Sequence, residues 1–126
     1  MKARIPLFAL FLMLGPVSAQ ADYIDVITNQ LTGSCTLEKY LEVVEEFRGV
    51  MTSEGYSYTV EIMTPVSGPD LSHVYWVGRT KDFATFGTEF TKWLAALEKS
   101  GSPESKVNAK LNKCAANLTR TGAMTN

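Results

Sequence analysis

Apolar residues recur along this chain with two different spacings, and the order of these spacings limits the folds open to it. Segments 22–31, 56–62 and 71–78 are rich in β-branched and aromatic residues at alternating or closely spaced positions, which is typical of strands. Segments 36–55 and 82–99 repeat apolar residues every three or four positions, which is typical of amphipathic helices. The sequence therefore predicts a strand, a helix, two strands and a second helix, in that order.

The C-terminal part of the chain adds a short helix and a last strand. Ser102 and Pro103 have the character of a helix N-cap followed by a proline at the first helical position. Residues 118–124 are expected to form a strand that is interrupted at Gly122. No repeat, low-complexity segment or long linker divides residues 22–126, so they are expected to form a single domain.

This order of elements predicts an α+β, ferredoxin-like βαββαβ fold, with the helices on one face of a four-stranded antiparallel sheet. Right-handed crossovers give the strand order 4-1-3-2, in which the third strand is central. That strand places His73, Tyr75 and Val77 on one face and Val74 and Trp76 on the other, as a strand covered on both sides requires. We therefore expect a homodimer in which two sheets meet face to face; the alternative is a mixed, solvated open face.

The first 21 residues differ in character from the rest of the chain. Lys2 and Arg4 precede an apolar run over residues 5–14, and small residues follow as far as Ala21. This pattern is typical of a secretory signal peptide, and the run is far shorter than the roughly 20 apolar residues that a membrane-spanning helix needs. We expect residues 1–21 to be removed, leaving a periplasmic or secreted protein without a membrane anchor.

The charge balance and the size of the chain exclude several classes of function. The 126 residues carry 12 Lys and Arg against 13 Asp and Glu, and loss of Lys2 and Arg4 changes the balance to 10 − 13 = −3. A chain with this balance lacks the basic field that nucleic-acid binding requires, so no nucleic-acid partner is expected. One domain of this size also leaves no room for a separate cofactor-binding domain.

The two cysteines provide a test of the predicted topology. Cys35 follows the first strand and Cys114 precedes the last one. If these strands lie side by side and antiparallel, both cysteines lie at the same edge of the domain. A disulfide between them suits an oxidising compartment and closes a loop of 114 − 35 = 79 residues. Two thiols and one distant histidine are too few for a zinc site, so no metal is expected.

Two segments of the chain resemble a known superfamily. The strand and helix in VYWVGRTKDFATFGTEFTKWLAAL, together with the earlier helix CTLEKYLEVVEEF, resemble the dimeric α/β barrel proteins, and the chain looks like their small exported members without assigned activity. The resemblance implies a ferredoxin-like protomer, a face-to-face dimer and a cavity between sheet and helices. Relatives include cofactor-independent quinol-type monooxygenases and haem-binding enzymes, so the fold does not define the function.

The strands carry few residues that could perform catalysis. His73, the one histidine, could act as a base or as an axial haem ligand, or could simply be a half-exposed residue at the end of a strand. Asp25, Asn29 and Glu61 could present polar groups to an internal cavity. A cofactor-independent monooxygenase or isomerase would use His73 with Glu61 or Asp25. Related monooxygenases often have a histidine on the second helix, and segment 82–99 contains none.

The pairing register decides whether these residues meet. If Thr64 pairs with Leu71, His73 lies opposite Ile62, and a slip of one residue places it opposite Glu61 instead. The sequence favours neither register.

Other residues favour ligand binding over catalysis. Tyr58, Tyr75 and Trp76 could line an aromatic pocket, and Arg79 beside the start of the second helix could hold an anion. The chain has no glycine-rich phosphate loop and no nucleophile elbow. The preferred hypothesis is a disulfide-bonded, exported dimer that binds a small apolar or aromatic ligand and needs no cofactor. The oxygenase, isomerase and haem hypotheses are the alternatives.

Overall fold

The computed structural model describes residues 21–126, so the expected signal peptide lies almost entirely outside the described residues. The elements follow in the order β1 (Tyr23–Leu31), α1 (Leu37–Ser53), β2 (Thr59–Met63), β3 (His73–Thr80), α2 (Phe83–Leu97), α3 (Pro103–Cys114) and β4 (Ala115–Met124). The strands form one antiparallel sheet in the order β2-β3-β1-β4, which confirms the predicted ferredoxin-like arrangement. None of the helices in this part of the chain combines the length and apolarity needed to cross a bilayer.

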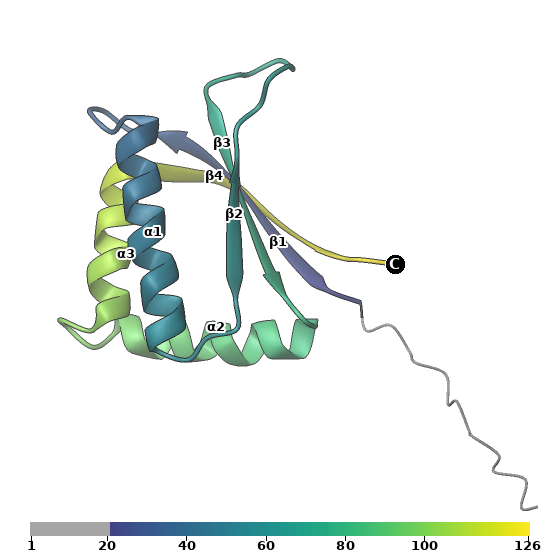
Figure 1. The fold of residues 1–126 in the computed structure, drawn as a ribbon, viewed down its shortest axis with the longest axis vertical. Coiled ribbons are helices and arrows are strands. Elements are labelled where there is room, and N and C mark those ends of the chain that lie inside the picture. The colour runs from purple at the N-terminus through teal and green to yellow at the C-terminus, as the bar shows by residue number, and fades with distance from the viewer. Residues whose placement is uncertain (1–20) are drawn as a thin grey trace, which may run out of the picture.

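The core forms where α1 and α3 pack against the sheet. These two helices lie side by side, whereas α2 runs crosswise to them (Figure 1). The side chains buried in this core come from both helices and from the inner face of the sheet; they include Tyr40, Val44, Phe47, Val107 and Trp76. Thr36 accepts a hydrogen bond from the Lys39 amide and so caps α1, and Ser102 caps α3 in the same way.

The helix α2 is packed differently from α1. None of its residues is fully buried, and the side chains of Phe83 and Leu94 are 60% and 47% exposed. Its N-terminus is well defined, because the Asp82 carboxylate accepts a hydrogen bond of 2.6 Å from the Thr85 amide. The aromatic stripe of α2 is therefore held beside the sheet without being covered by it.

Of the four strands, β2 and β4 begin farthest from the expected residues. β2 begins at Thr59 instead of Tyr56, because the amides of Ser57 and Tyr58 donate to the Glu89 carboxylate of α2. β4 begins at Ala115, directly after α3, and continues through Gly122 without interruption.

The register of β3 differs from both of the expected alternatives. Met63 pairs with Tyr75, and Glu61 pairs with Val77. His73 pairs with Gln30 of β1 and lies beyond the end of β2. The reason is that the loop between β2 and β3 is longer than a tight hairpin; it projects from one end of the sheet (Figure 1).

A disulfide joins Cys35 and Cys114 in the structure, in agreement with the topology-based prediction. Their Cα atoms are 5.1 Å apart. The Thr32 amide and hydroxyl donate hydrogen bonds of 2.9 Å to the backbone oxygens of Cys114 and Lys113. The end of β1 is thus held to the junction of α3 and β4 by both covalent and hydrogen bonds.

Candidate ligand-binding site

A salt bridge between Asp25 and Arg120 lies on the helix-facing side of the sheet. Asp25 of β1 is completely buried, and it pairs in register with Gly78 of β3 on one side and Gly122 of β4 on the other. The rings of Tyr58 and Tyr23 occupy the space that side chains at these glycines would need: a Cβ at Gly78 would come within 1.7 Å of the Tyr58 hydroxyl. The two glycines therefore allow aromatic rings to cover a buried carboxylate.

The Asp25 carboxylate is fully engaged by its neighbours. Arg120 of β4 donates from Nε to Oδ1 at 2.8 Å and from Nη2 to Oδ2 at 2.7 Å. The Tyr58 hydroxyl donates to Oδ2 at 3.0 Å and accepts a hydrogen bond of 2.8 Å from Nε1 of Trp76. The bond to Asp25 raises the pKa of Arg120, and burial raises the pKa of the Tyr58 phenol. Hydrogen bonds thus link Asp25, Arg120, Tyr58 and Trp76 into one network.

A cavity of about 160 Å³ lies beside this network, between the sheet and the helices. Its lining comes from all three helices and from the inner face of the sheet, and aromatic residues are its largest group. The aromatic lining residues are Tyr40, Phe47, Tyr56, Tyr58, Trp76, Phe86, Phe90 and Trp93. The Phe47 ring meets Trp76 and Trp93 edge to face, with centroid separations of 4.7 and 5.5 Å.

One side of the cavity is polar. It carries Asn29 of β1, Asn108 and Asn112 of α3, and Asn117 of β4, which pairs in register with Asn29. Asn29 is 3% exposed, whereas Asn112 and Asn117 are exposed, so the amides extend from the interior to the surface. Arg120 also lines the cavity, with its guanidinium 4.9 Å from the centroid of the Phe90 ring of α2.

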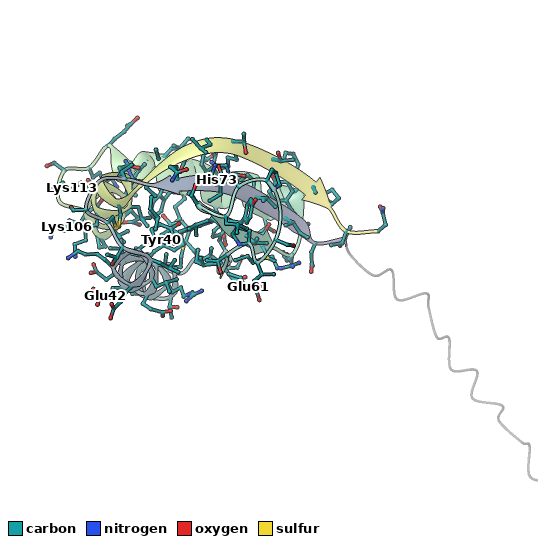
Figure 2. All side chains as sticks on the ribbon, turned by 90° about the horizontal axis from the view of Figure 1, so that it is seen from above. Tyr40, Glu42, Glu61, His73, Lys106 and Lys113 are labelled. Atoms are coloured by element: carbon teal, nitrogen blue, oxygen red, sulfur yellow. A yellow bond between two sulfur atoms is a disulfide. The ribbon has the colours of Figure 1, made fainter. Side chains whose placement is uncertain are left out.

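The tyrosine of α1 connects the polar and aromatic sides. Figure 2 shows Tyr40 between α1 and the sheet, and Glu42 on the opposite side of the helix. The Tyr40 hydroxyl accepts a hydrogen bond of 3.4 Å from Nδ2 of Asn29. Burial raises the pKa of Tyr40 to about 12, so this phenol is neutral at physiological pH.

The structure brings together two of the predicted ligand-binding residues. Tyr58 and Trp76 both line the cavity and are hydrogen-bonded to one another. Tyr75 and Arg79 do not contribute, because they alternate with Trp76 along β3 and so lie on the open face of the sheet.

The structure does not bring the three candidate catalytic residues His73, Glu61 and Asp25 together. Glu61 pairs with Val77 and is exposed on the open face, whereas Asp25 is buried on the helix side. His73 contacts Asp70, with Nε2 3.0 Å from Oδ2, and does not line the cavity. Figure 2 shows His73 and Glu61 well apart. Alternation of side chains along the strands separates the residues that the hypothesis combined.

Several residues of the site were not predicted from the sequence. Arg120 is 95 positions from Asp25, so only the strand pairing brings them together. The sequence gave little indication of the asparagines. Asn108 and Asn112 are spaced i, i+4 on α3, and Asn117 lies near the start of β4. One signal was present: glycines within two predicted strands often mark the close approach of another group.

Solved structures align with most of this chain at low sequence identity. The sequence matches no protein-family model and no curated protein. A dimeric protein of unknown function and ferredoxin-like fold from Bacteroides fragilis NCTC 9343 aligns with 82% of this chain and 94% of its own, at 7% identity and a TM-score of 0.45. A conserved protein from Methanosarcina mazei Go1 aligns with 85% of this chain and 93% of its own, at 10% identity and a TM-score of 0.47.

Proposed function

We propose that this protein binds a small apolar or aromatic ligand in the cavity between its sheet and its helices. The observation that carries the proposal is the lining itself, in which eight aromatic side chains surround about 160 Å³. An apolar protein cavity of about 150 Å³ accommodates benzene, so this one suits a ligand of one or two rings. It is smaller than the roughly 300–1,000 Å³ typical of sites for drug-sized molecules, which argues against a haem.

Binding rather than catalysis is favoured by how the ionisable groups are used. Asp25 is held by Arg120 and Tyr58, and Glu89 accepts hydrogen bonds from the Ser57 and Tyr58 amides. A general base must be free to take a proton from the ligand. These carboxylates are occupied instead in holding the walls of the cavity.

Tryptophan fluorescence tests the proposal directly, because the chain contains two tryptophans and both Trp76 and Trp93 line the cavity. A panel of one- and two-ring compounds that do not absorb at the excitation wavelength should include members that change the emission and raise the thermal midpoint. A ligand at 100 times its Kd adds about 2.7 kcal/mol to the free energy of unfolding, a shift of several degrees. No response across the panel would contradict the proposal.

A pair of variants on one helix provides the control. Asn112→Phe places a large ring where the cavity meets the solvent and should weaken ligand binding. Lys113→Phe makes the same change at an adjacent exposed position that does not line the cavity, and binding should be unaffected.

We further propose that the protein is a homodimer formed through the open face of its sheet. Ile24, Val26, Tyr75 and Val77 lie on this face, which no helix covers in the described part of the chain. Apolar residues grouped on such a face favour association of two copies about a two-fold axis. Light scattering should give twice the protomer mass, and Val26→Arg should halve it without changing ligand binding. A monomer at micromolar concentration would contradict this arrangement.

Export from the cytoplasm is the third part of the proposal. Its support is the Cys35–Cys114 disulfide, which is stable in oxidising compartments, together with the signal-like character of residues 1–21. Mass spectrometry of the protein recovered outside the cytoplasm should give a chain that begins near Asp22 and contains no alkylatable thiol. An uncleaved chain with two free thiols would contradict it.

A further inference from the structure

Asn29 presents to the cavity an oxygen that nothing in the described structure satisfies. The residue is 3% exposed and lines the cavity. Its Nδ2 donates to the Tyr40 hydroxyl, but its Oδ1 has no hydrogen-bond partner among residues 21–126. A buried acceptor without a donor is unfavourable and is rare in folded proteins. An unsatisfied oxygen at the wall of a cavity therefore indicates a ligand that donates a hydrogen bond.

The charges at the cavity indicate that this ligand is neutral. Arg120 and Glu89 are the charged residues that line it within residues 21–126. Asp25 neutralises Arg120 through two hydrogen bonds. Glu89 accepts three, of 2.7, 2.7 and 3.0 Å, from the amide and hydroxyl of Ser57 and the amide of Tyr58. An anion would be desolvated without gaining a free counter-charge, because Arg120 is already paired with Asp25, and a cation would meet at Glu89 a carboxylate that three neutral donors already bind.

We propose that the ligand is an uncharged aromatic molecule with a hydrogen-bond donor on or beside its ring, and that Oδ1 of Asn29 accepts that hydrogen bond. The inference rests on the ligand-binding function proposed above and specifies the chemistry of the ligand. The aromatic walls select the ring, the amide oxygen selects the donor, and the existing contacts of Arg120 and Glu89 disfavour ions.

Two bicyclic compounds of the same shape test the donor. Indole carries a ring N–H, and benzofuran has an oxygen acceptor at the same place. Calorimetric titration of the purified protein should show indole binding about tenfold more tightly than benzofuran, the effect of one buried hydrogen bond. Equal binding, or tighter binding of benzofuran, would overturn the donor inference and leave the cavity function intact. Failure of both compounds to bind would contradict the cavity function as well.

A variant of Asn29 tests whether its side-chain oxygen causes the preference for indole over benzofuran. Asn29→Leu should abolish the roughly tenfold preference for indole over benzofuran, and the ratio of the two affinities measures this loss. Tyr40→Phe is the matched control, because it removes the partner of Nδ2 but keeps Oδ1, and should retain the preference for indole. If Asn29→Leu does not fold, Asn29→Ala makes the same test. Retention of the indole preference in a folded Asn29 variant would overturn the assignment.

A charged analogue tests neutrality. Indole-5-carboxylate keeps the N–H and adds an anion, and it should bind at least tenfold more weakly than indole. Comparable or tighter binding would show that Arg120 is available to a ligand anion and would overturn the inference that the site selects neutral molecules.

Discussion

The helices α1 and α2 border the same cavity, yet they are packed in opposite ways. α1 carries six charged residues, Glu38, Lys39, Glu42, Glu45, Glu46 and Arg48, and buries five side chains. α2 carries two, Glu89 and Lys92, and buries none completely. The more apolar helix is thus the less covered one. Apolar surface left uncovered in a small domain usually marks a binding site, so α1 is the helix that contributes most to the core and α2 is the wall of the proposed ligand site.

The contacts that hold the two helices differ in kind. α1 is held by close packing of Val44 and Phe47 in the core. α2 is held by the Asp82 cap and by Glu89, whose carboxylate binds the backbone before β2. Polar anchors thus supplement the ring contacts of α2, such as those of Trp93 with Phe47 and of Phe86 with Tyr23.

The largest predicted effect is the loss of unfolding free energy when an apolar residue of either helix is replaced by aspartate. Val44→Asp buries an unpaired carboxylate at a position that is 0% exposed, and it should cost at least about 4 kcal/mol of unfolding free energy. Leu94→Asp places the same group at a position on α2 that is 47% exposed, and should cost less than about 1 kcal/mol. Urea unfolding measures both. Equal losses would show that α2 is part of the stabilising core.

The disulfide ties the start of α1 to the end of α3. The double variant Cys35→Ala, Cys114→Ala should lose roughly 2–4 kcal/mol, since the bridge closes a 79-residue loop in the unfolded chain. The same loss should follow reduction of the native protein. An unchanged urea midpoint after complete reduction would contradict the stabilising role.

A pair of glycines tests the packing around Asp25. Gly78→Ala forces the Tyr58 ring from its place and should cost about 1–3 kcal/mol. Gly87→Ala in α2 meets nothing within 4 Å and should stabilise the protein by about 0.5–1 kcal/mol, because alanine is the better helix former. Thermal unfolding of the two variants should shift in opposite directions. Shifts in the same direction would contradict the ring placement.

The smallest effect concerns alkaline pH. Burial raises the pKa of Tyr40 to about 12, above the 10.0 of an unperturbed tyrosine. Between pH 10 and 12 the unfolded chain therefore releases a proton that the folded one retains, and stability falls as the pH rises, by at most about 1.4 kcal/mol per pH unit. Tyr40→Phe should reduce this slope. Tyr23→Phe, at a phenol beside α2 whose pKa burial also raises, should reduce it less.

Much of the fold could be predicted from the sequence, because each element carries its own local signal. The period of 3.6 defines α1, Ser102 and Pro103 define the start of α3, and the order of elements defines the sheet. The strand order alone is then enough to predict that Cys35 lies beside Cys114.

The site was less predictable, because it depends on contacts between distant segments. Sequence patterns gave the alternation within β3 but not the register between strands, which the long loop before His73 changes. They did not show that Arg120 would reach Asp25. They also gave α2 an apolar stripe but not the degree to which that stripe is covered, since this depends on its crosswise orientation (Figure 1).

The Cys35–Cys114 disulfide also determines what happens when a protease cuts the chain. The most exposed apolar residues of the described chain include Val66 and Leu71, in the loop between β2 and β3. A protease that cuts this loop separates the chain into two fragments, one ending after β2 and the other beginning before β3. Each fragment contains one half-cystine, so the two stay covalently joined, and the strands on either side of the cut keep their pairing. On a denaturing gel, the nicked protein would migrate as one species without reductant and as two fragments once the disulfide is reduced.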